Sequence, residues 1–201
     1  MGIFYNEKNR VFTIQTKSST YAMKIAKYNL LCHLYYGEKV SEDEDLSYLM
    51  NNGGTSLDAV YNEINHFTYE KKGVGNLCPN SLRQEYSAFG IGEHRTPCLF
   101  GRFSDGSSAI DLRYESHKII EGKPELTGLP SFYANQDEKA QTLIITLKDT
   151  VYDLYVELYY SVIDGHNEIM RSAKIINKTG ADYTLESALS LCLDMHRSTL
   201  R

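Results

Sequence analysis

Hydrophobic and polar side chains alternate along much of this chain. Three runs, "TLIITL", "LYVELYYSV" and "YTLESALSLCLDM", place an apolar residue at nearly every second position. The residues that would share one face are Leu143, Ile145 and Leu147; Leu154, Val156, Leu158, Tyr160 and Val162; and Tyr183, Leu185, Leu189, Leu191 and Leu193. A period of two residues indicates half-buried β-strands.

Turn signals separate these runs. Asn, Asp and Gly cluster at 6–9, 104–107, 164–167 and 177–180, and these residues favour turns because they tolerate left-handed backbone or bond to their own chain. The apolar positions change parity near "AKYNLL", which indicates a turn or bulge there. Strands joined by short turns form antiparallel hairpins rather than βαβ units. We therefore predict an all-β fold, an antiparallel β-sandwich with at most short helices.

One region lacks this pattern. Residues 41–82 begin with the acidic run "SEDEDL", pass through "NNGG" and end in "KKGVGNLCPN". A short helix fits 56–64, where Ser56 is placed to cap it. A long, weakly patterned stretch inside a β domain predicts an irregular loop that is functional or mobile.

Composition narrows the class of protein. The 201 residues are 42% hydrophobic and 23% charged with a net charge of -5, which argues against nucleic acid as a partner because phosphate binding needs a basic surface. No apolar run approaches the roughly 18 residues of a membrane span, and the first residues lack the features of a signal peptide. We therefore expect a cytoplasmic protein that has no membrane partner.

Cysteines and histidines give no sign of a metal site. The four cysteines, Cys32, Cys78, Cys98 and Cys192, form no CxxC pair and are best interpreted as free, buried thiols. No two Cys or His residues stand at zinc-finger spacing. The sequence predicts neither a metal nor a cofactor.

The segment "GIGEHRTP" at 90–97 places an acid, an imidazole and a guanidinium side by side. It is not a dinucleotide fingerprint, because Arg95 stands where the third glycine belongs and "CLFGRFS" after it reads as a strand. In an extended segment, Glu93, His94 and Arg95 point to alternating faces and do not converge on one substrate atom. The structural interpretation is favoured: Arg95 holds a buried carboxylate or backbone carbonyls, and Pro97 fixes the entry into the next strand.

The sixteen tyrosines have two interpretations. They are suited to stacking on sugars, but tyrosine also favours strands and covers sheet faces, and this second interpretation is preferred. His33, His117 and His166 are scattered and are best seen as satisfied polar groups. The residues alone predict a β-sandwich whose best ligand class is carbohydrate.

Several ordered motifs resemble the amino-terminal domain of glycoside hydrolase family 36 α-galactosidases. They are "SSTYAMKI", "LLCHLYYGEKV", "LRQEYSAFGIGEHRTP", "DLRYESHKIIEGKPELTGLPSFY", "EKAQTLIITLKD", "NEIMRSAKIINKTG" and "ESALSLCLDM". The resemblance runs from about residue 3 to about residue 195. Its most specific part is "GKPELTGLPSFY" followed in order by "AQTLIITLKD" and "EIMRSAKIIN".

The resemblance implies a multidomain hydrolase. Such enzymes join an amino-terminal β-supersandwich to a catalytic (β/α)8 barrel and a small carboxy-terminal β domain. Without a cofactor they release terminal α-linked galactose from melibiose, raffinose and related oligosaccharides, using two barrel aspartates in a retaining mechanism. Residues 1–201 are then the supersandwich domain, incomplete at its carboxy end, with no catalytic residue in this chain and no activity of its own.

The resemblance also bears on individual residues. The family segment usually reads Gly-Asp-Phe-Arg-x-Pro, so Arg95 and Pro97 fit as a structural loop, while Glu93 keeps an acid and His94 replaces an aromatic residue. In tetrameric members, a loop corresponding to 41–69 reaches towards a neighbouring subunit's active site. Asp58 is therefore a candidate substrate-binding residue and a homo-oligomer is expected. The plainer interpretation of Asp58, a solvated acid or a helix-start residue, is favoured.

Two other functions remain open. One is a free-standing β-sandwich module that binds carbohydrate or mediates assembly. The other is a sugar-acting enzyme of mutarotase-like architecture, which would need a histidine and a carboxylate converging on a concave face. The reading frame downstream of codon 201 separates these from the α-galactosidase, which requires a barrel with two catalytic aspartates.

Overall fold

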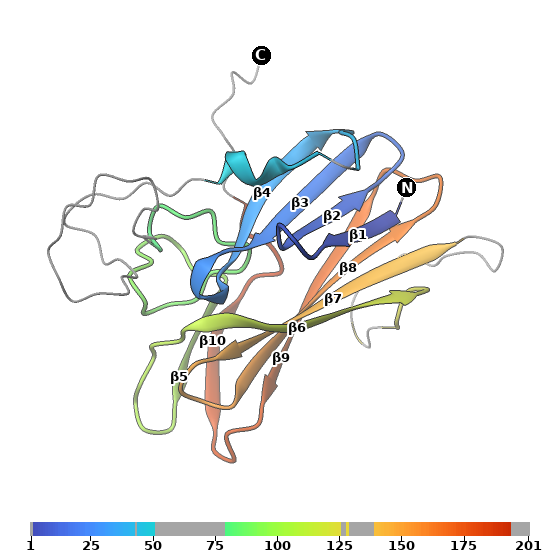
Figure 1. Cartoon of the computed structure of the whole chain (residues 1–201). Coiled ribbons are helices and arrows are strands. Elements are labelled where there is room, and N and C mark those ends of the chain that lie inside the picture. Colours follow the sequence, from blue (N-terminus) through green and yellow to red (C-terminus); the bar gives the residue numbers. More distant parts are fainter. Residues whose placement is uncertain (1, 43, 51–78, 126–127, 129–138, 194–201) are drawn as a thin grey trace, which may run out of the picture.

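The fold is that of a computed structural model, which describes residues 2–42, 44–50, 79–125, 128 and 139–193 (Figure 1). In the described part of the chain, ten strands account for nearly all regular structure, together with two single-turn 3-10 helices. The elements are β1 (Gly2–Asn6), β2 (Val11–Gln15), β3 (Ser19–Ile25), η1 (Lys27–Asn29), β4 (Leu31–Glu38), η2 (Leu46–Leu49), β5 (Leu99–Phe103), β6 (Leu112–Glu121), β7 (Ala140–Asp149), β8 (Leu154–Ile163), β9 (Ile169–Asn177) and β10 (Tyr183–Ala188). The all-β prediction is confirmed.

The strands form three antiparallel groups. Two are four-stranded meanders with the orders β1-β2-β3-β4 and β6-β7-β8-β9, and the third is the two-stranded ribbon β10-β5. Neighbours in each meander are consecutive in sequence, as expected for antiparallel hairpins, although β6 and β7 are joined by the longer segment 122–139 rather than by a short turn. The predicted turns at 104–107 and 164–167 lie between β5 and β6 and between β8 and β9.

Alternation in β7 and β8 correctly predicts the buried face. Leu143, Ile145 and Leu147 are buried, as are Leu154, Val156, Leu158, Tyr160 and Val162. In the β7–β8 register, Leu143 lies opposite Tyr160 and Ile145 opposite Leu158. Cross-strand pairs of this kind are the unit of sheet stabilisation because their side chains pack on the same face.

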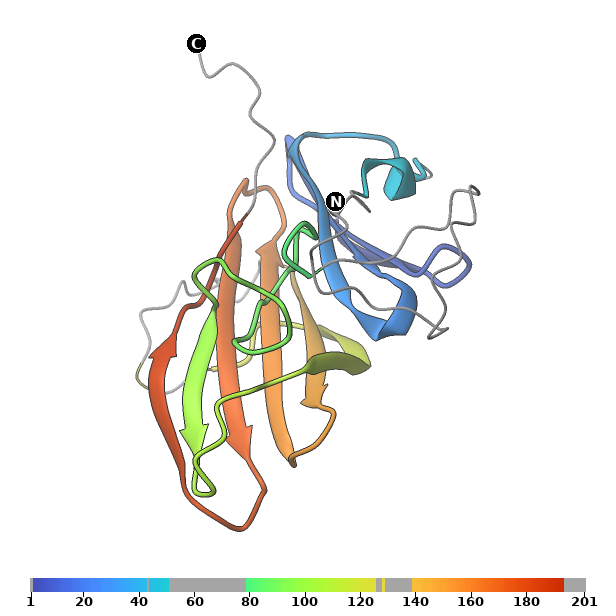
Figure 2. The ribbon, with the colours of Figure 1, turned by 90° about the vertical axis from the view of Figure 1, so that its left-hand side faces the viewer.

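The two meanders pack face to face, and their shared core lies between them. The β1–β4 sheet covers the upper part of the β6–β9 sheet, and the β5–β10 ribbon lies along its lower part (Figures 1 and 2). One continuous cluster joins Phe12 and Met23 of the first sheet, Leu143 and Leu158 of the second, and Phe103 of the ribbon. The second layer of the sandwich is therefore built from two separate pieces.

The predicted strand over 183–193 is only half present. β10 ends at Ala188, and its register with β5 shifts between Leu185 and Ser187. A bulge of this kind inserts a residue and turns the following side chains to the other face. Leu185, ahead of the bulge, is already 50% exposed, and Leu189 and Leu191 beyond it are 37% and 44% exposed, while Cys192 and Leu193 pack against the core.

The parity change near "AKYNLL" is confirmed as a turn. η1 separates β3 from β4, and both Tyr28 and Asn29 adopt positive φ, at 59° and 58°. In region 41–82, the structure describes η2 and its Asp45 cap. The predicted helix over 56–64 lies outside the described residues. No described helix has the length and apolar character needed to cross a membrane.

Candidate functional site

The "GEHR" segment is tied down by an ion pair within the loop. Glu93 is buried, and its Oε1 accepts hydrogen bonds from the Arg95 backbone N–H (2.9 Å) and from Arg95 Nε (2.7 Å). Arg95 Nη2 donates to the carbonyl oxygen of Leu82 at 2.7 Å, and Gln84 Nε2 donates to Glu93 Oε2 at 3.2 Å. His94 is exposed. Arg95 thus holds both the Glu93 carboxylate and a backbone carbonyl, the kind of contacts expected of a structural residue.

Residues 83–89, which precede this loop, run between the edges of two sheets and form backbone hydrogen bonds to both. The backbone N–H of Glu85 donates to Leu31 of β4 (2.9 Å), and the N–H of His33 donates to the carbonyl of Arg83 (2.7 Å). Four residues further on, Phe89 donates to Leu99 of β5 at 3.1 Å. These bonds hold the Glu85 side chain between the two layers of the sandwich.

Glu85 is the centre of a buried polar cluster. The Tyr21 hydroxyl donates to both of its carboxylate oxygens, at 2.6 and 2.8 Å, and the Tyr160 hydroxyl donates to Oε1 at 2.8 Å. Arg171 places Nη1 3.0 Å from Oε1, and its Nη2 donates to the Glu85 backbone oxygen at 2.9 Å. His33 Nδ1 lies 3.5 Å from Oε2. Glu85 itself is fully buried, so these partners replace its hydration.

The electrostatics of the cluster keep Glu85 ionised. Burial by itself raises the pKa of this carboxyl, but the Arg171 guanidinium, His33 and the Tyr21 hydroxyl together outweigh that effect and place the pKa below its usual value. Burial and the neighbouring Glu85 charge raise the pKa of Tyr21 and of Tyr160 well above the ordinary value. Both phenols therefore stay protonated and act as donors to the carboxylate.

The cluster satisfies one condition for a mutarotase-like site but not the other. A histidine and a carboxylate do converge, because His33 and Glu85 are 3.5 Å apart. Both are buried, at 5% and 0% exposure, and neither lines the pocket described next. The carboxylate is occupied by its partners within the core, so the arrangement is structural.

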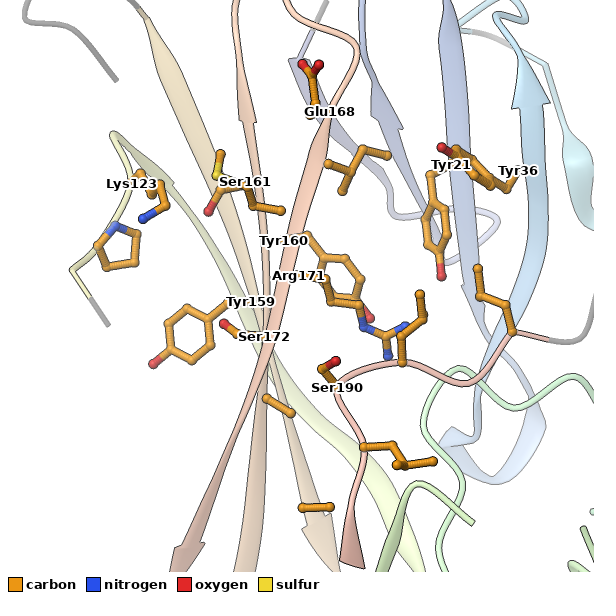
Figure 3. A pocket seen from close by; sticks show the side chains of 18 of the residues that line it. Tyr21, Tyr36, Lys123, Tyr159, Tyr160, Ser161, Glu168, Arg171, Ser172 and Ser190 are labelled. Carbon is orange, nitrogen blue, oxygen red and sulfur yellow. The ribbon is translucent and has the colours of Figure 1, made fainter. Parts of the chain in front are cut away.

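A pocket of about 980 Å³ opens beside this cluster, along β9 (Figure 3). Tyr21 and Tyr36 approach it from the β1–β4 sheet, Arg171 lies at its centre, and Ser190 and Leu191 come from the segment after β10. Most of its lining is apolar, as is usual for binding pockets. Within the described residues, no group of three or more His, Cys, Asp or Glu side chains is arranged to hold a metal ion.

Other predicted residues fall outside this site or outside the described chain. Asp58, the candidate substrate-binding residue, lies in 51–78, which the structure does not describe. Pro97 stands two residues before β5. Cys32 and Cys98 are free and buried, while Cys192 is free and only partly buried; Cys78 is outside the described residues.

Solved structures give the class of protein that this sandwich belongs to. The α-galactosidase from Lactobacillus brevis superposes with a TM-score of 0.84 at 30% identity, covering 96% of this chain and 25% of the other. A variant of the family 36 α-galactosidase AgaA from Geobacillus stearothermophilus, solved in complex with raffinose, gives a TM-score of 0.77 at 30% identity, covering 92% of this chain and 24% of the other. The fold is therefore that of a β-sandwich domain found in α-galactosidases.

Sequence comparison identifies the particular family. Residues 29–201 match the glycosyl hydrolase family 36 N-terminal domain, and the chain belongs to that family. The bifunctional alpha-galactosidase/sucrose kinase AgaSK of Mediterraneibacter gnavus is 34% identical over 96% of this chain, a match that covers 20% of AgaSK. The chain thus spans about a fifth to a quarter of the length of the relatives it matches.

Proposed function

We propose that this chain is the non-catalytic amino-terminal domain of an α-galactosidase that hydrolyses terminal α-linked galactose from oligosaccharides of the melibiose and raffinose type. The observation that carries the proposal is the family match over 29–201. Its relatives bear the name α-galactosidase, and one of them was solved with raffinose. In this proposal, residues 1–201 are one supersandwich domain whose carboxy-terminal part is not included in the chain.

The described acids support a non-catalytic role. A retaining glycosidase needs two carboxyl groups about 5 Å apart on either side of the scissile bond. The buried acids Glu85, Glu93 and Asp149 instead accept hydrogen bonds from the protein itself. In line with what the family resemblance implies, we assign the nucleophile and the acid/base to two aspartates of a barrel domain elsewhere in the enzyme.

Assembly and location are part of the same proposal. The full-length enzyme is expected to be a homo-oligomer, most simply a tetramer, in which loop 41–69 of one subunit approaches the active site of a neighbour. A cytoplasmic location is supported by the free thiols of Cys32, Cys98 and Cys192, since disulfides form in oxidising compartments.

The 201-residue chain is expected to show no α-galactosidase activity, whereas the longer protein read from the same gene is active. The physical reason is that the bond-breaking carboxylates lie outside this domain. Both proteins are assayed on a chromogenic α-galactoside at equal molar concentration. Turnover by the short chain that disappears when a residue within 1–201 is replaced would contradict the proposal, and an inactive longer protein would favour a carbohydrate-binding or assembly module.

Asp58→Ala in the longer enzyme is expected to lower kcat/KM for raffinose by about tenfold, which corresponds to about 1.4 kcal/mol, with a much smaller loss on an aryl galactoside. A carboxylate at the entrance contacts sugars beyond the scissile bond, and a small aryl substrate lacks those sugars. Asp164→Ala, an exposed acid in the β8–β9 turn, is the matched control. Equal losses on both substrates, or none, would show that Asp58 is only a surface acid.

A further inference from the structure

We propose that the free edge of β9 and the pocket beside it receive a further β-strand of the same polypeptide, one that carries an uncharged hydrogen-bond acceptor to Arg171. The inference rests on the proposed function, because it requires that the chain continue into a longer enzyme. The inference adds the place where the continuing polypeptide binds and the kind of side chain that it contributes.

β1 and β10 are also edge strands with a single partner, and what sets the edge of β9 apart is the pocket that runs along it. β4 is covered by residues 83–85, and β5 by residues 87–89, through the backbone bonds described above. β6 is an edge strand with the charged, exposed residues Glu115, Lys118 and Glu121, which discourage strand addition. β9 pairs with β8 alone among the described strands. Every second peptide unit of β9 therefore points its N–H and C=O away from β8, towards a side on which no described strand pairs.

The surface next to this edge is apolar. Ile169, Ala173 and Ile175 of β9 face the pocket together with Leu189 and Leu191 from the opposite wall. The last two are 37% and 44% exposed in the described structure. A contiguous exposed apolar surface marks a place where another element packs, and its position beside an unpaired strand favours another strand.

Arg171 supplies the polar part of the recognition. Its side chain is only 8% exposed. Nη2 is bonded to the Glu85 backbone, and Nη1 lies 3.0 Å from the Glu85 carboxylate as an ion pair but without hydrogen-bond geometry. Nε is also buried and has neither an ion-pair nor a hydrogen-bond partner among the described residues. Buried donors in folded proteins are nearly always hydrogen-bonded, so an acceptor for Nε is expected in the complete protein.

The charge balance specifies the acceptor. Arg171 and Glu85 already neutralise each other, so a second carboxylate in the pocket would be a buried, uncompensated charge. A neutral acceptor, from Ser, Thr, Asn or Gln, satisfies Nε without that cost. Side chains on adjacent strands lie opposite each other on one face, so the incoming strand is expected to carry apolar residues two positions before and after this acceptor, over Ile169 and Ala173.

The same polypeptide is the occupant for two reasons. Leu193, the last described residue before 194–201, itself lines the pocket, so the polypeptide leaves the described part of the domain beside this edge. The relatives continue far beyond the matched region, which is only 20–25% of their length. A strand supplied by the same polypeptide also has a high effective concentration at this site.

The test compares amide hydrogen exchange in β9 between the 201-residue chain, at low micromolar concentration, and the longer protein read from the gene. We expect the β9 amides to exchange roughly tenfold or more slowly in the longer protein, because strand pairing protects them. Leu191→Lys is expected to remove much of that protection in the longer protein while leaving the short chain unchanged. Val151→Lys, an exposed apolar position (79%) outside the pocket, is the matched control and is expected to leave both proteins unchanged.

Other outcomes would overturn the inference. Equal β9 exchange in the two proteins shows that no strand is added there. Protection in the longer protein that depends on its concentration assigns the edge to a second copy, and protection that appears only with added raffinose assigns the pocket to a sugar. The α-galactoside assay on the same longer protein keeps the two proposals apart, because an active enzyme with an unprotected β9 contradicts only the strand.

Discussion

Glu85→Ala is expected to lower the free energy of unfolding by about 3–5 kcal/mol, the range for breaking a buried ion pair from one side. The substitution leaves the Arg171 guanidinium buried without its counter-charge, and it leaves the Tyr21 and Tyr160 hydroxyls without the acceptor they share. Urea unfolding of the 201-residue chain measures the loss. Because the carboxylate joins the 83–89 segment to both sheets, the whole sandwich should unfold at lower urea rather than one element alone.

Two variants separate this effect from a general loss of charge. Glu186→Gln removes an acid whose partner, Arg102, is 3.6 Å away at the surface, and should cost no more than about 1 kcal/mol. The double variant Glu85→Leu with Arg171→Met replaces both buried charges by apolar groups and should recover a large part of the loss. A loss for Glu85→Ala as small as that for Glu186→Gln would show that the cluster contributes little.

The pKa shift of Glu85 adds a dependence on pH. Since the pKa is lower in the folded protein than its ordinary value of 4.5, the contribution of the carboxylate is fully present above that value and is lost as pH falls through the folded pKa. Glu85→Gln lacks this titration. The stability difference between wild type and Glu85→Gln should therefore shrink as the pH is lowered below about 4.5, as measured by urea unfolding at several pH values.

The fold was predictable where one sheet face is buried and the other is not. In β7 and β8 the apolar face packs against a second layer, so the alternation at Leu143 and Leu158 has a single physical explanation and the prediction held. In β10 the same alternation was misleading. There the partner strand β5 has only five residues, and the bulge after Leu185 is created by pairing, which the apolar pattern of one strand does not show.

The buried cluster around Glu85 could not be predicted from the sequence because its members are far apart in the chain. Glu85 meets Tyr21 across 64 residues, Tyr160 across 75 and Arg171 across 86. No spacing rule connects such positions. One signal was present: Arg171 occupies the same face of its strand as Ile169, Ala173 and Ile175, and an arginine within an apolar face needs a buried partner.

The Arg95 loop was easier to interpret because its contacts are local. Glu93 and Arg95 are two residues apart, so an extended segment places them on one side and His94 on the other. The sequence left open whether Arg95 would hold a carboxylate or carbonyls, and the structure shows both, in Glu93 and Leu82. The role of the glycines in front of this loop becomes clear only from their neighbours in space.

Gly90→Ala is expected to destabilise the 201-residue chain by about 3 kcal/mol, from strain in the backbone and from overpacking. Gly90 has a φ of +112°, which residues with an L side chain rarely adopt. A Cβ at this position would lie 2.5 Å from the Ala109 Cα, which belongs to the backbone and cannot move aside as the end of a flexible side chain could. The two segments are held together at this point, because the Ile110 N–H donates to the carbonyl oxygen of Phe89 at 2.9 Å. Gly106→Ala is the matched control: its φ is +88°, but open space surrounds the added Cβ, so only the backbone cost of about 1–2 kcal/mol applies. Urea unfolding of both variants measures the difference. If Gly90→Ala costs no more than Gly106→Ala, the close contact with Ala109 is relieved at little cost, and the glycine is needed only for its backbone conformation.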